Sequence, residues 1–112
     1  MKNTILLFVL FPFVGLGQVD TAAVRAEVDS LLNLSRENTE KGLFEEADQL
    51  TDEAEKTVLK VFGKESAAYA SVCFNRGRVL DFQNSFFEAE EWYLKSKVLR
   101  EQVLGKTHPD YF

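Results

Sequence analysis

The chain of 112 residues has little of the chemistry on which enzymes and metal sites depend. It contains one histidine, His108, and one cysteine, Cys73. A single histidine cannot supply the ligand set of a metal ion, and a single cysteine cannot close an internal disulfide. No Ser–His–Asp or Cys–His set and no glycine-rich phosphate loop can be built from the sequence. We therefore expect no catalytic, metal-binding or cofactor-binding residue, and we expect that the chain is not an enzyme.

Positive charge is also scarce. The chain has 13 Lys and Arg residues against 18 Asp and Glu residues, which gives a formal net charge of −5 at pH 7. Non-specific binding to nucleic acids or to anionic membranes depends on clustered basic side chains. The composition therefore argues against nucleic acid as a partner.

The first 17 residues have the layout of a secretory signal peptide. Lys2 precedes an apolar run at 5–14, and the small residues Gly15 and Gly17 follow it. The competing interpretation is a membrane anchor, but the run is shorter than the roughly 20 residues that a spanning helix needs, and Pro12 lies inside it. We predict export to the periplasm or the medium, cleavage near Gly17, and no stable membrane insertion of residues 18–112.

The rest of the chain contains an internal repeat with an offset of 42 residues. Residues 24–70 align with 66–112, and the identical pairs are Ala26/Ala68, Asn33/Asn75, Arg36/Arg78, Phe44/Phe86, Glu46/Glu88, Ala47/Ala89, Val61/Val103, Gly63/Gly105, Lys64/Lys106 and Tyr69/Tyr111. Self-similarity at such a period is typical of solenoid proteins. Chance similarity between two amphipathic helices would not also align the glycine and the lysine that follow each helix.

Hydrophobic spacing predicts helices within each repeat. Apolar or small residues recur every three or four positions at 24–34, 44–61, 69–80 and 86–103, which is the helical period. Asp20 or Thr21 can cap the first helix, and Ser66 can cap the third. Gly42, Gly63 and Gly105 follow the expected helix ends, where a left-handed residue is common.

These features resemble the tetratricopeptide repeat, in the 42-residue form found in kinesin light chains. The motif residues of the second repeat are Gly77, Asn84, Phe86, Glu88, Ala89, Tyr93 and Ser96, followed by the connection at 104–110. The resemblance implies an all-α fold, a right-handed α-solenoid of antiparallel helix hairpins. It places repeat 1 at about 24–65, repeat 2 at about 66–107 and a truncated third repeat from 108. Asn38, Thr51 and Arg76 depart from the apolar or aromatic residues that are usual in the family.

In helix-pair solenoids the first helices of the pairs line a concave surface, where side chains not used in packing bind partners. Asn and Arg lie three residues apart in both repeats and so share a helical face. The resemblance implies that an Asn at this position contacts bound peptide. The candidate peptide-binding residues are Asn33, Arg36, Phe74, Asn75 and Arg78. The alternative is that these Asn and Arg side chains are solvated or form hydrogen bonds between the repeats.

Two functions follow from this interpretation. The first is an exported scaffold that binds a peptide or protein partner in the groove lined by the first helices. The alternative is the N-terminal repeat arm of a larger secreted enzyme or sensor, such as a caspase-like CHAT-domain protease. Because the third repeat is incomplete, we also expect Trp92, Tyr93, Leu99 and Val103 to lack cover, which would allow self-association through the C-terminal repeat face.

Overall fold

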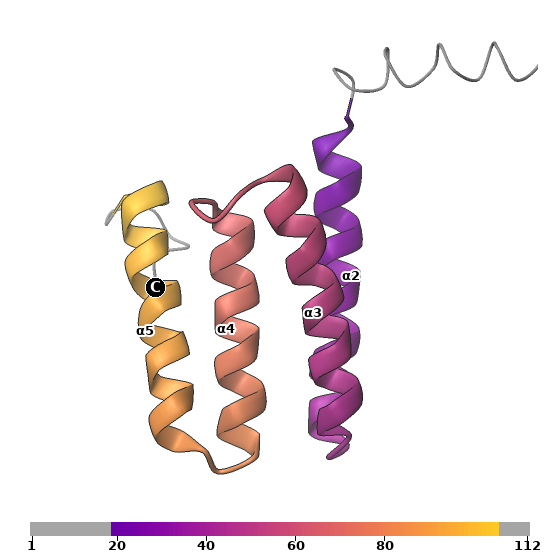
Figure 1. Cartoon of the computed structure of the whole chain (residues 1–112), viewed down its shortest axis with the longest axis vertical. Coiled ribbons are helices and arrows are strands. Elements are labelled where there is room, and N and C mark those ends of the chain that lie inside the picture. The colour runs from indigo at the N-terminus through magenta and orange to yellow at the C-terminus, as the bar shows by residue number, and fades with distance from the viewer. Residues whose placement is uncertain (1–18, 106–112) are drawn as a thin grey trace, which may run out of the picture.

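Four antiparallel helices form the part of the chain that the structure describes. The computed structural model describes residues 19–105, in which the helices are α2 (Thr21–Glu40), α3 (Phe44–Val61), α4 (Ala67–Phe82) and α5 (Phe86–Leu104). They stand side by side and alternate in direction, as Figure 1 shows. The described residues contain no β-strand. The predicted all-α helical repeat architecture is confirmed, whereas the predicted signal peptide and the start of a third repeat lie outside the described residues.

Capping residues and left-handed turns set the helix boundaries. The Asp20 carboxylate accepts a hydrogen bond from the Ala23 backbone N–H at 3.1 Å, and the Ser66 hydroxyl accepts one from the Tyr69 N–H at 3.1 Å. Each bond satisfies a backbone donor that has no partner within its helix. Gly42 and Asn84 occupy equivalent turns between paired helices, with φ of 82° and 65°. Glycine reaches this region without strain, and asparagine tolerates it better than most residues.

The two hairpins keep the register that the repeat predicts. Helices α2 and α4 end at Glu40 and Phe82, and helices α3 and α5 begin at Phe44 and Phe86, so both boundaries differ by 42 residues. The second hairpin therefore repeats the first in the position of its turn as well as in sequence.

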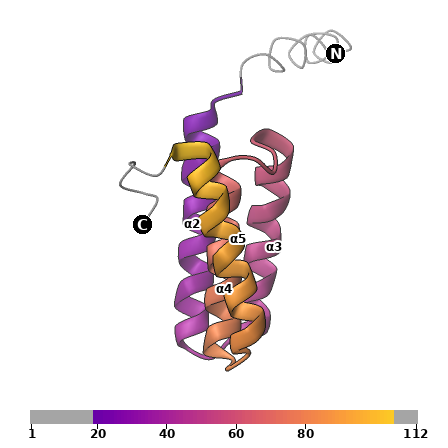
Figure 2. The ribbon, with the colours of Figure 1, turned by 90° about the vertical axis from the view of Figure 1, so that its left-hand side faces the viewer.

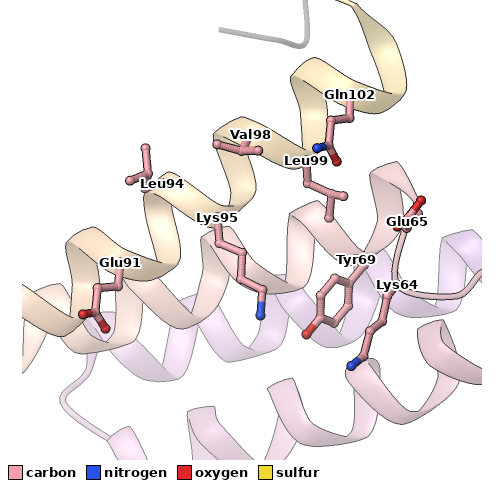
Figure 3. Close-up of a pocket in the computed structure, with 9 residues that line it drawn as sticks. All are labelled: Lys64, Glu65, Tyr69, Glu91, Leu94, Lys95, Val98, Leu99 and Gln102. Atoms are coloured by element: carbon pink, nitrogen blue, oxygen red, sulfur yellow. The ribbon is translucent and has the colours of Figure 1, made fainter.

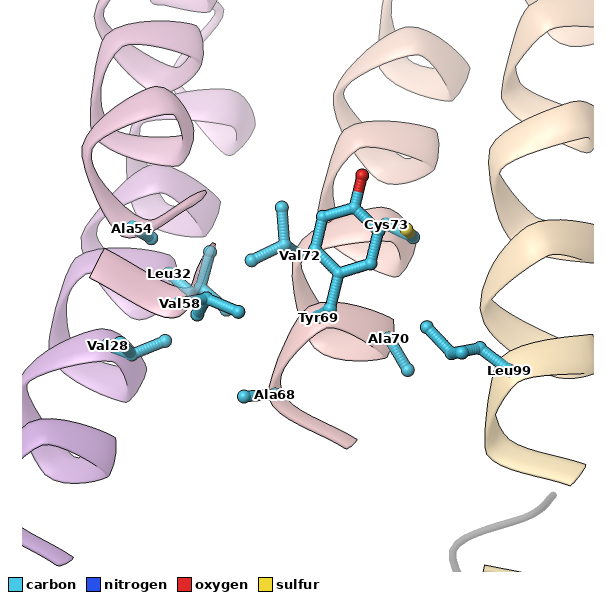
Figure 4. Close-up of a cluster of buried hydrophobic side chains, with 10 residues drawn as sticks. All are labelled: Val28, Leu32, Ala54, Val58, Ala68, Tyr69, Ala70, Val72, Cys73 and Leu99. Carbon is cyan, nitrogen blue, oxygen red and sulfur yellow. The ribbon is translucent and has the colours of Figure 1, made fainter. Parts of the chain in front are cut away.

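Helix α4 is the centre of the structure, because it packs against α2, α3 and α5. Figures 1 and 2 show it between α5 and the α2–α3 pair. The apolar core that results is drawn in Figure 4 and consists of Val28, Leu32, Ala54, Val58, Ala68, Tyr69, Ala70, Val72, Cys73 and Leu99. Leu99 is only 9% exposed, so the expectation that it lacks cover was wrong: it packs back on α4 within its own hairpin. In the described part of the chain, no helix is long and apolar enough to cross a bilayer.

The two hairpins fill their interiors in different ways. In the first hairpin, Ser35 and Thr51 are fully buried, and their hydroxyl oxygens lie 3.0 Å apart. The equivalent residues of the second hairpin are Gly77 and Tyr93. A Cβ atom on Gly77 would lie 2.7 Å from Cδ1 of the Tyr93 ring. Glycine is therefore required at 77 because the aromatic ring occupies the space that a side chain would need.

Candidate functional site

A groove between α2 and α4 collects most of the residues predicted to bind peptide. We call it the α2–α4 groove, and its cavity of about 330 Å³ is lined by Asp29, Leu32, Asn33, Arg36, Ser71, Phe74, Asn75 and Arg100. The lining includes Asn33, Arg36, Phe74 and Asn75 and excludes the fifth candidate, Arg78. Two arginines and one aspartate line it, so it carries a local positive charge on an acidic chain.

Asn75 is held rigidly at the bottom of this groove. Its side chain is 2% exposed, and its Nδ2 donates hydrogen bonds of 2.9 Å to Ser35 Oγ and to Thr51 Oγ1. Both hydroxyls donate their own protons to the backbone oxygen of Ala47, at 2.9 and 2.8 Å. The hydroxyls can therefore only accept from Asn75, which fixes the orientation of the amide. The hydrogen bonds between repeats that were the alternative interpretation are present at Asn75.

The carbonyl oxygen of the Asn75 side chain differs from its nitrogen in having no hydrogen-bond partner among the described residues. Asn75 Oδ1 is buried and accepts no hydrogen bond from any described residue. Its position is fixed, because Nδ2 has to face the two hydroxyls of the first hairpin. A buried carbonyl without a donor costs free energy, so a ligand N–H that reached this oxygen would be stabilised.

Asn33 and Arg36 lie at the exposed rim of the groove. Arg36 Nη1 donates to Asn33 Oδ1 at 2.9 Å, which confirms that the two residues share a helical face. This bond leaves the amide N–H groups of Asn33 pointing away from Arg36. Phe74 is 46% exposed, and its ring centroid lies 5.1 Å from that of Tyr93. The groove thus combines amide donors, a guanidinium and an aromatic surface.

Arg78 is placed outside the groove. Its Nη2 forms a salt bridge of 2.9 Å with Glu40 of α2, and its guanidinium lies 5.2 Å from the centre of the Phe82 ring. The salt bridge joins the second hairpin to the first near the end of α2, and the contact with Phe82 lies within α4. The structure therefore separates Arg78 from the other four candidates, although Arg36 occupies the equivalent position in the first repeat.

Residues that the sequence did not single out complete the opposite end of the groove. Arg25 Nη2 and Arg100 Nη2 each lie 3.3 Å from Ser71 Oγ, so guanidinium groups from α2 and α5 meet at one hydroxyl of α4. Arg25 also pairs with Asp29 through its Nε at 3.2 Å. The sequence did not predict that Arg25, Ser71 and Arg100 lie together, because none of them recurs at the equivalent position of the other repeat.

The opposite side of α4 is a polar packing surface. Arg76 Nη2 bridges Asp52 and Glu55 of α3, and the guanidinium lies 5.8 Å from the centre of the Trp92 ring. Burial opposes its charge, but the hydrogen bonds to Asp52 and Glu55 outweigh this effect and raise the pKa of Arg76. Arg76 is therefore an ion-pair partner that links the two repeats.

A second groove runs along α5 near the N-terminus of α4. It is drawn in Figure 3, where Leu94 and Val98 project from the outer side of α5 and Lys95 extends toward Tyr69. The Lys95 ammonium lies 5.6 Å from the centre of the Tyr69 ring. The equivalent positions to Leu94 and Val98 on α3 are charged, so the apolar character belongs to the second repeat alone.

Buried titratable groups offer no reactive centre. Burial is the largest cause that raises the pKa of the Cys73 thiol, which keeps it protonated and poorly nucleophilic. Among residues 19–105, no three His, Cys, Asp or Glu side chains are grouped so that they could hold a metal ion. The lining of the α2–α4 groove offers amide, hydroxyl and charged groups to a ligand.

Comparison with known proteins agrees with this arrangement. A family model described as a tetratricopeptide repeat matches residues 72–110, which include α5 and most of α4. Searches of curated proteins and of solved structures gave no significant match.

Proposed function

We propose that the chain is an exported scaffold whose α2–α4 groove binds a peptide or protein partner, because a model of the tetratricopeptide repeat, a protein-interaction fold, matches residues 72–110. The observation that carries the proposal is the meeting of Asn33, Arg36, Phe74 and Asn75 in one groove. These residues come from both repeats, so the groove exists only when the hairpins pack together.

The side chains of the groove match the groups of an extended peptide. A peptide backbone presents both donors and acceptors. The amide N–H groups of Asn33 can donate to its carbonyls, and Asn75 Oδ1 is the acceptor that has no partner among the described residues. Asn75 Oδ1 is a buried acceptor fixed in position, so binding costs little conformational entropy at this atom. Phe74 and the buried Leu32 supply an apolar surface for a ligand side chain. The layout of residues 1–17 supports export.

A selected peptide provides the test. A random peptide library would be screened against the purified chain, and the affinity of the best binder would be measured by calorimetry. We expect Phe74→Ala and the double variant Asn33→Ala/Arg36→Ala each to weaken binding at least about tenfold. Arg78→Ala is the matched control, because Arg78 is equivalent to Arg36 but lies outside the groove, and it should change the affinity less than about twofold.

The opposite pattern would exclude the groove as the binding site. If the two groove variants bind the peptide with wild-type affinity, the proposal fails. Asn75→Ala is unsuitable for this test, since Asn75 also holds the hairpins together.

We further propose that two copies associate weakly through α5. Its outer side carries Phe87, Leu94 and Val98, which are 86%, 57% and 43% exposed. Exposed apolar side chains that share one helix face favour association, and a symmetric pair would bring the same face of both copies together.

A further inference from the structure

We propose that the groove along α5 receives Phe87 of a second copy, so that two chains pair through antiparallel α5 helices. This inference rests on the proposed self-association through α5 and names its geometry. Its basis is that α5 carries both a protruding ring and a cavity. Phe87 is 86% exposed, and the groove beside Leu94 and Val98 has a volume of about 490 Å³. Figure 3 shows these two aliphatic side chains at the outer edge of the groove.

Phe87 does not fill the groove of its own chain. The part of α5 that lines the groove begins at Glu91, one turn after Phe87, and ends at Gln102. Phe87 and Val98 are 11 residues apart, which is about three helical turns and roughly 16 Å along the axis. Because this spacing is close to whole turns, the two side chains lie on one face of the helix. The protruding ring and the cavity therefore lie at different heights along that face.

A two-fold axis perpendicular to α5 brings each ring to the cavity of the other copy. In this antiparallel pair, Phe87 of one copy is level with Val98 of the other, and symmetry repeats the contact. The two Leu94 side chains meet near the axis. A parallel pair would place Phe87 against Phe87 and leave both cavities open. The separation of ring and cavity therefore favours the antiparallel arrangement.

Charged side chains on one flank of this face favour the same arrangement. Glu90 and Lys97 are exposed, and neither forms an ion pair within residues 19–105. When Phe87 is level with Val98 of the other copy, Glu90 is nearly level with Lys97 of the other copy, so two opposite-charge contacts form. A parallel pair would instead bring Glu90 toward Glu91 of the other copy, which is repulsive.

The other flank contributes less to the pairing. Glu91 of one copy is level with Lys95 of the other in the same register. The Lys95 ammonium lies 5.6 Å from the centre of the Tyr69 ring and 4.9 Å from that of the Trp92 ring. It is directed toward these rings, so the contact between Glu91 and Lys95 is the weaker one and the tests do not depend on it.

Comparison of the repeats shows that the hairpin fold does not require this apolar face. The residues of α3 equivalent to Phe87, Leu94 and Val98 are Glu45, Asp52 and Lys56, and all three are exposed. The first hairpin therefore folds with charged side chains at the positions where the second hairpin exposes apolar ones.

Mixing two charge-reversal variants tests the register of the pair. Glu90→Lys and Lys97→Glu each bring like charges together in a pair of identical copies. We expect each change to weaken self-association at least about fivefold in sedimentation equilibrium. An equimolar mixture restores both opposite-charge contacts, so it should associate within about twofold of the wild-type chain. A mixture that associates no better than the separate variants would overturn the antiparallel register.

Phe87→Glu tests the inserted ring, because it introduces the residue of the first hairpin at this position. We expect it to weaken self-association at least about tenfold. Phe82→Glu is the matched control, since Phe82 is also exposed and is equivalent to Glu40, but it lies on α4 outside the pairing face. It should change the association less than about twofold. Equal effects of the two changes would overturn the inference.

The same measurements separate this inference from the general self-association through α5. If Leu94→Asp/Val98→Lys makes the chain monomeric while Phe87→Glu keeps wild-type association, the association through α5 stands and the insertion of Phe87 is refuted. If the wild-type chain is monomeric at every concentration, both proposals fail.

Discussion

Asn75 of α4 donates a hydrogen bond of 2.9 Å to Ser35 of α2, 40 residues earlier, and this bond lies in the buried seam between the two hairpins. A matching bond of 2.9 Å reaches Thr51 of α3, so one amide joins three helices. The seam is polar where most of the core is apolar. The hydroxyl protons of Ser35 and Thr51 are directed to the backbone oxygen of Ala47. The seam therefore accepts only one orientation of the Asn75 amide, and this fixes the register of the two hairpins.

Asn75→Leu tests the contribution of this seam to stability. The change leaves two buried hydroxyls without their donors, and we expect the free energy of unfolding to fall by about 2 kcal/mol or more. The measurement is urea denaturation followed by circular dichroism. Asn33→Leu is the matched control, because Asn33 occupies the equivalent repeat position but is exposed, and it should change the free energy by less than about 0.5 kcal/mol. Equal effects of the two changes would contradict the structural role of Asn75.

Gly77→Ala tests the contact between Gly77 and Tyr93. Alanine has the better helix propensity by about 1 kcal/mol, yet its Cβ would lie 2.7 Å from the Tyr93 ring. We expect overpacking to dominate and to lower the free energy of unfolding by about 1–3 kcal/mol. In the background of Tyr93→Thr, which restores the residue of the first hairpin, Gly77→Ala should cost less or should stabilise. An equal cost in both backgrounds would show that the ring is not responsible.

Alkaline pH should destabilise the fold through two tyrosine side chains, the buried Tyr69 and the half-buried Tyr93. Burial is the largest cause that raises the pKa of Tyr93, and Asp81, which accepts its hydrogen bond at 3.3 Å, adds to the increase. Burial likewise raises the pKa of Tyr69, with Cys73 and Glu55 as further causes. A phenol with a raised pKa holds its proton more tightly in the folded state, so its contribution to stability is complete below pH 10 and is lost as the pH rises through the folded pKa.

Urea midpoints measured between pH 8 and pH 11, together with the absorbance of tyrosinate, check this prediction. The double variant Tyr69→Phe/Tyr93→Phe should lose less stability above pH 10 than the wild-type chain does. If both proteins lose the same amount, other groups control the alkaline transition.

Weak self-association through α5 should depend on concentration. Leu94→Asp/Val98→Lys gives α5 the residues that α3 has at the equivalent positions 52 and 56, which are exposed there. We expect the wild-type chain to show an increase in average mass with concentration in sedimentation equilibrium, and the variant to remain monomeric. Because both changed side chains are exposed, the helical content should not change. A wild-type chain that stays monomeric at every concentration would contradict the proposed pairing.

Local sequence signals predicted most of the fold. The 42-residue offset, the helical spacing of apolar residues, the caps at Asp20 and Ser66 and the turns at Gly42 and Gly63 depend on neighbouring residues, so they could be read without coordinates. Side-chain exposure was less predictable: Leu34, which was placed on the apolar face of the first helix, is 48% exposed. Spacing defines a stripe along a helix, but the neighbouring helices decide which edge of that stripe is covered.

The sequence by itself determined that this chain contains two similar helix hairpins and that Asn and Arg recur at the same positions in each. Only the tertiary structure decided that these repeated residues differ in role. Asn75 is buried because the first hairpin packs against its helix, whereas Asn33 is exposed because α2 is the first helix of the described chain and has no earlier hairpin beside it. The same packing brings Arg25, Ser71 and Arg100 together from three helices. Similar local sequence therefore gives similar helix hairpins, while the role of each side chain depends on the surface that lies opposite it.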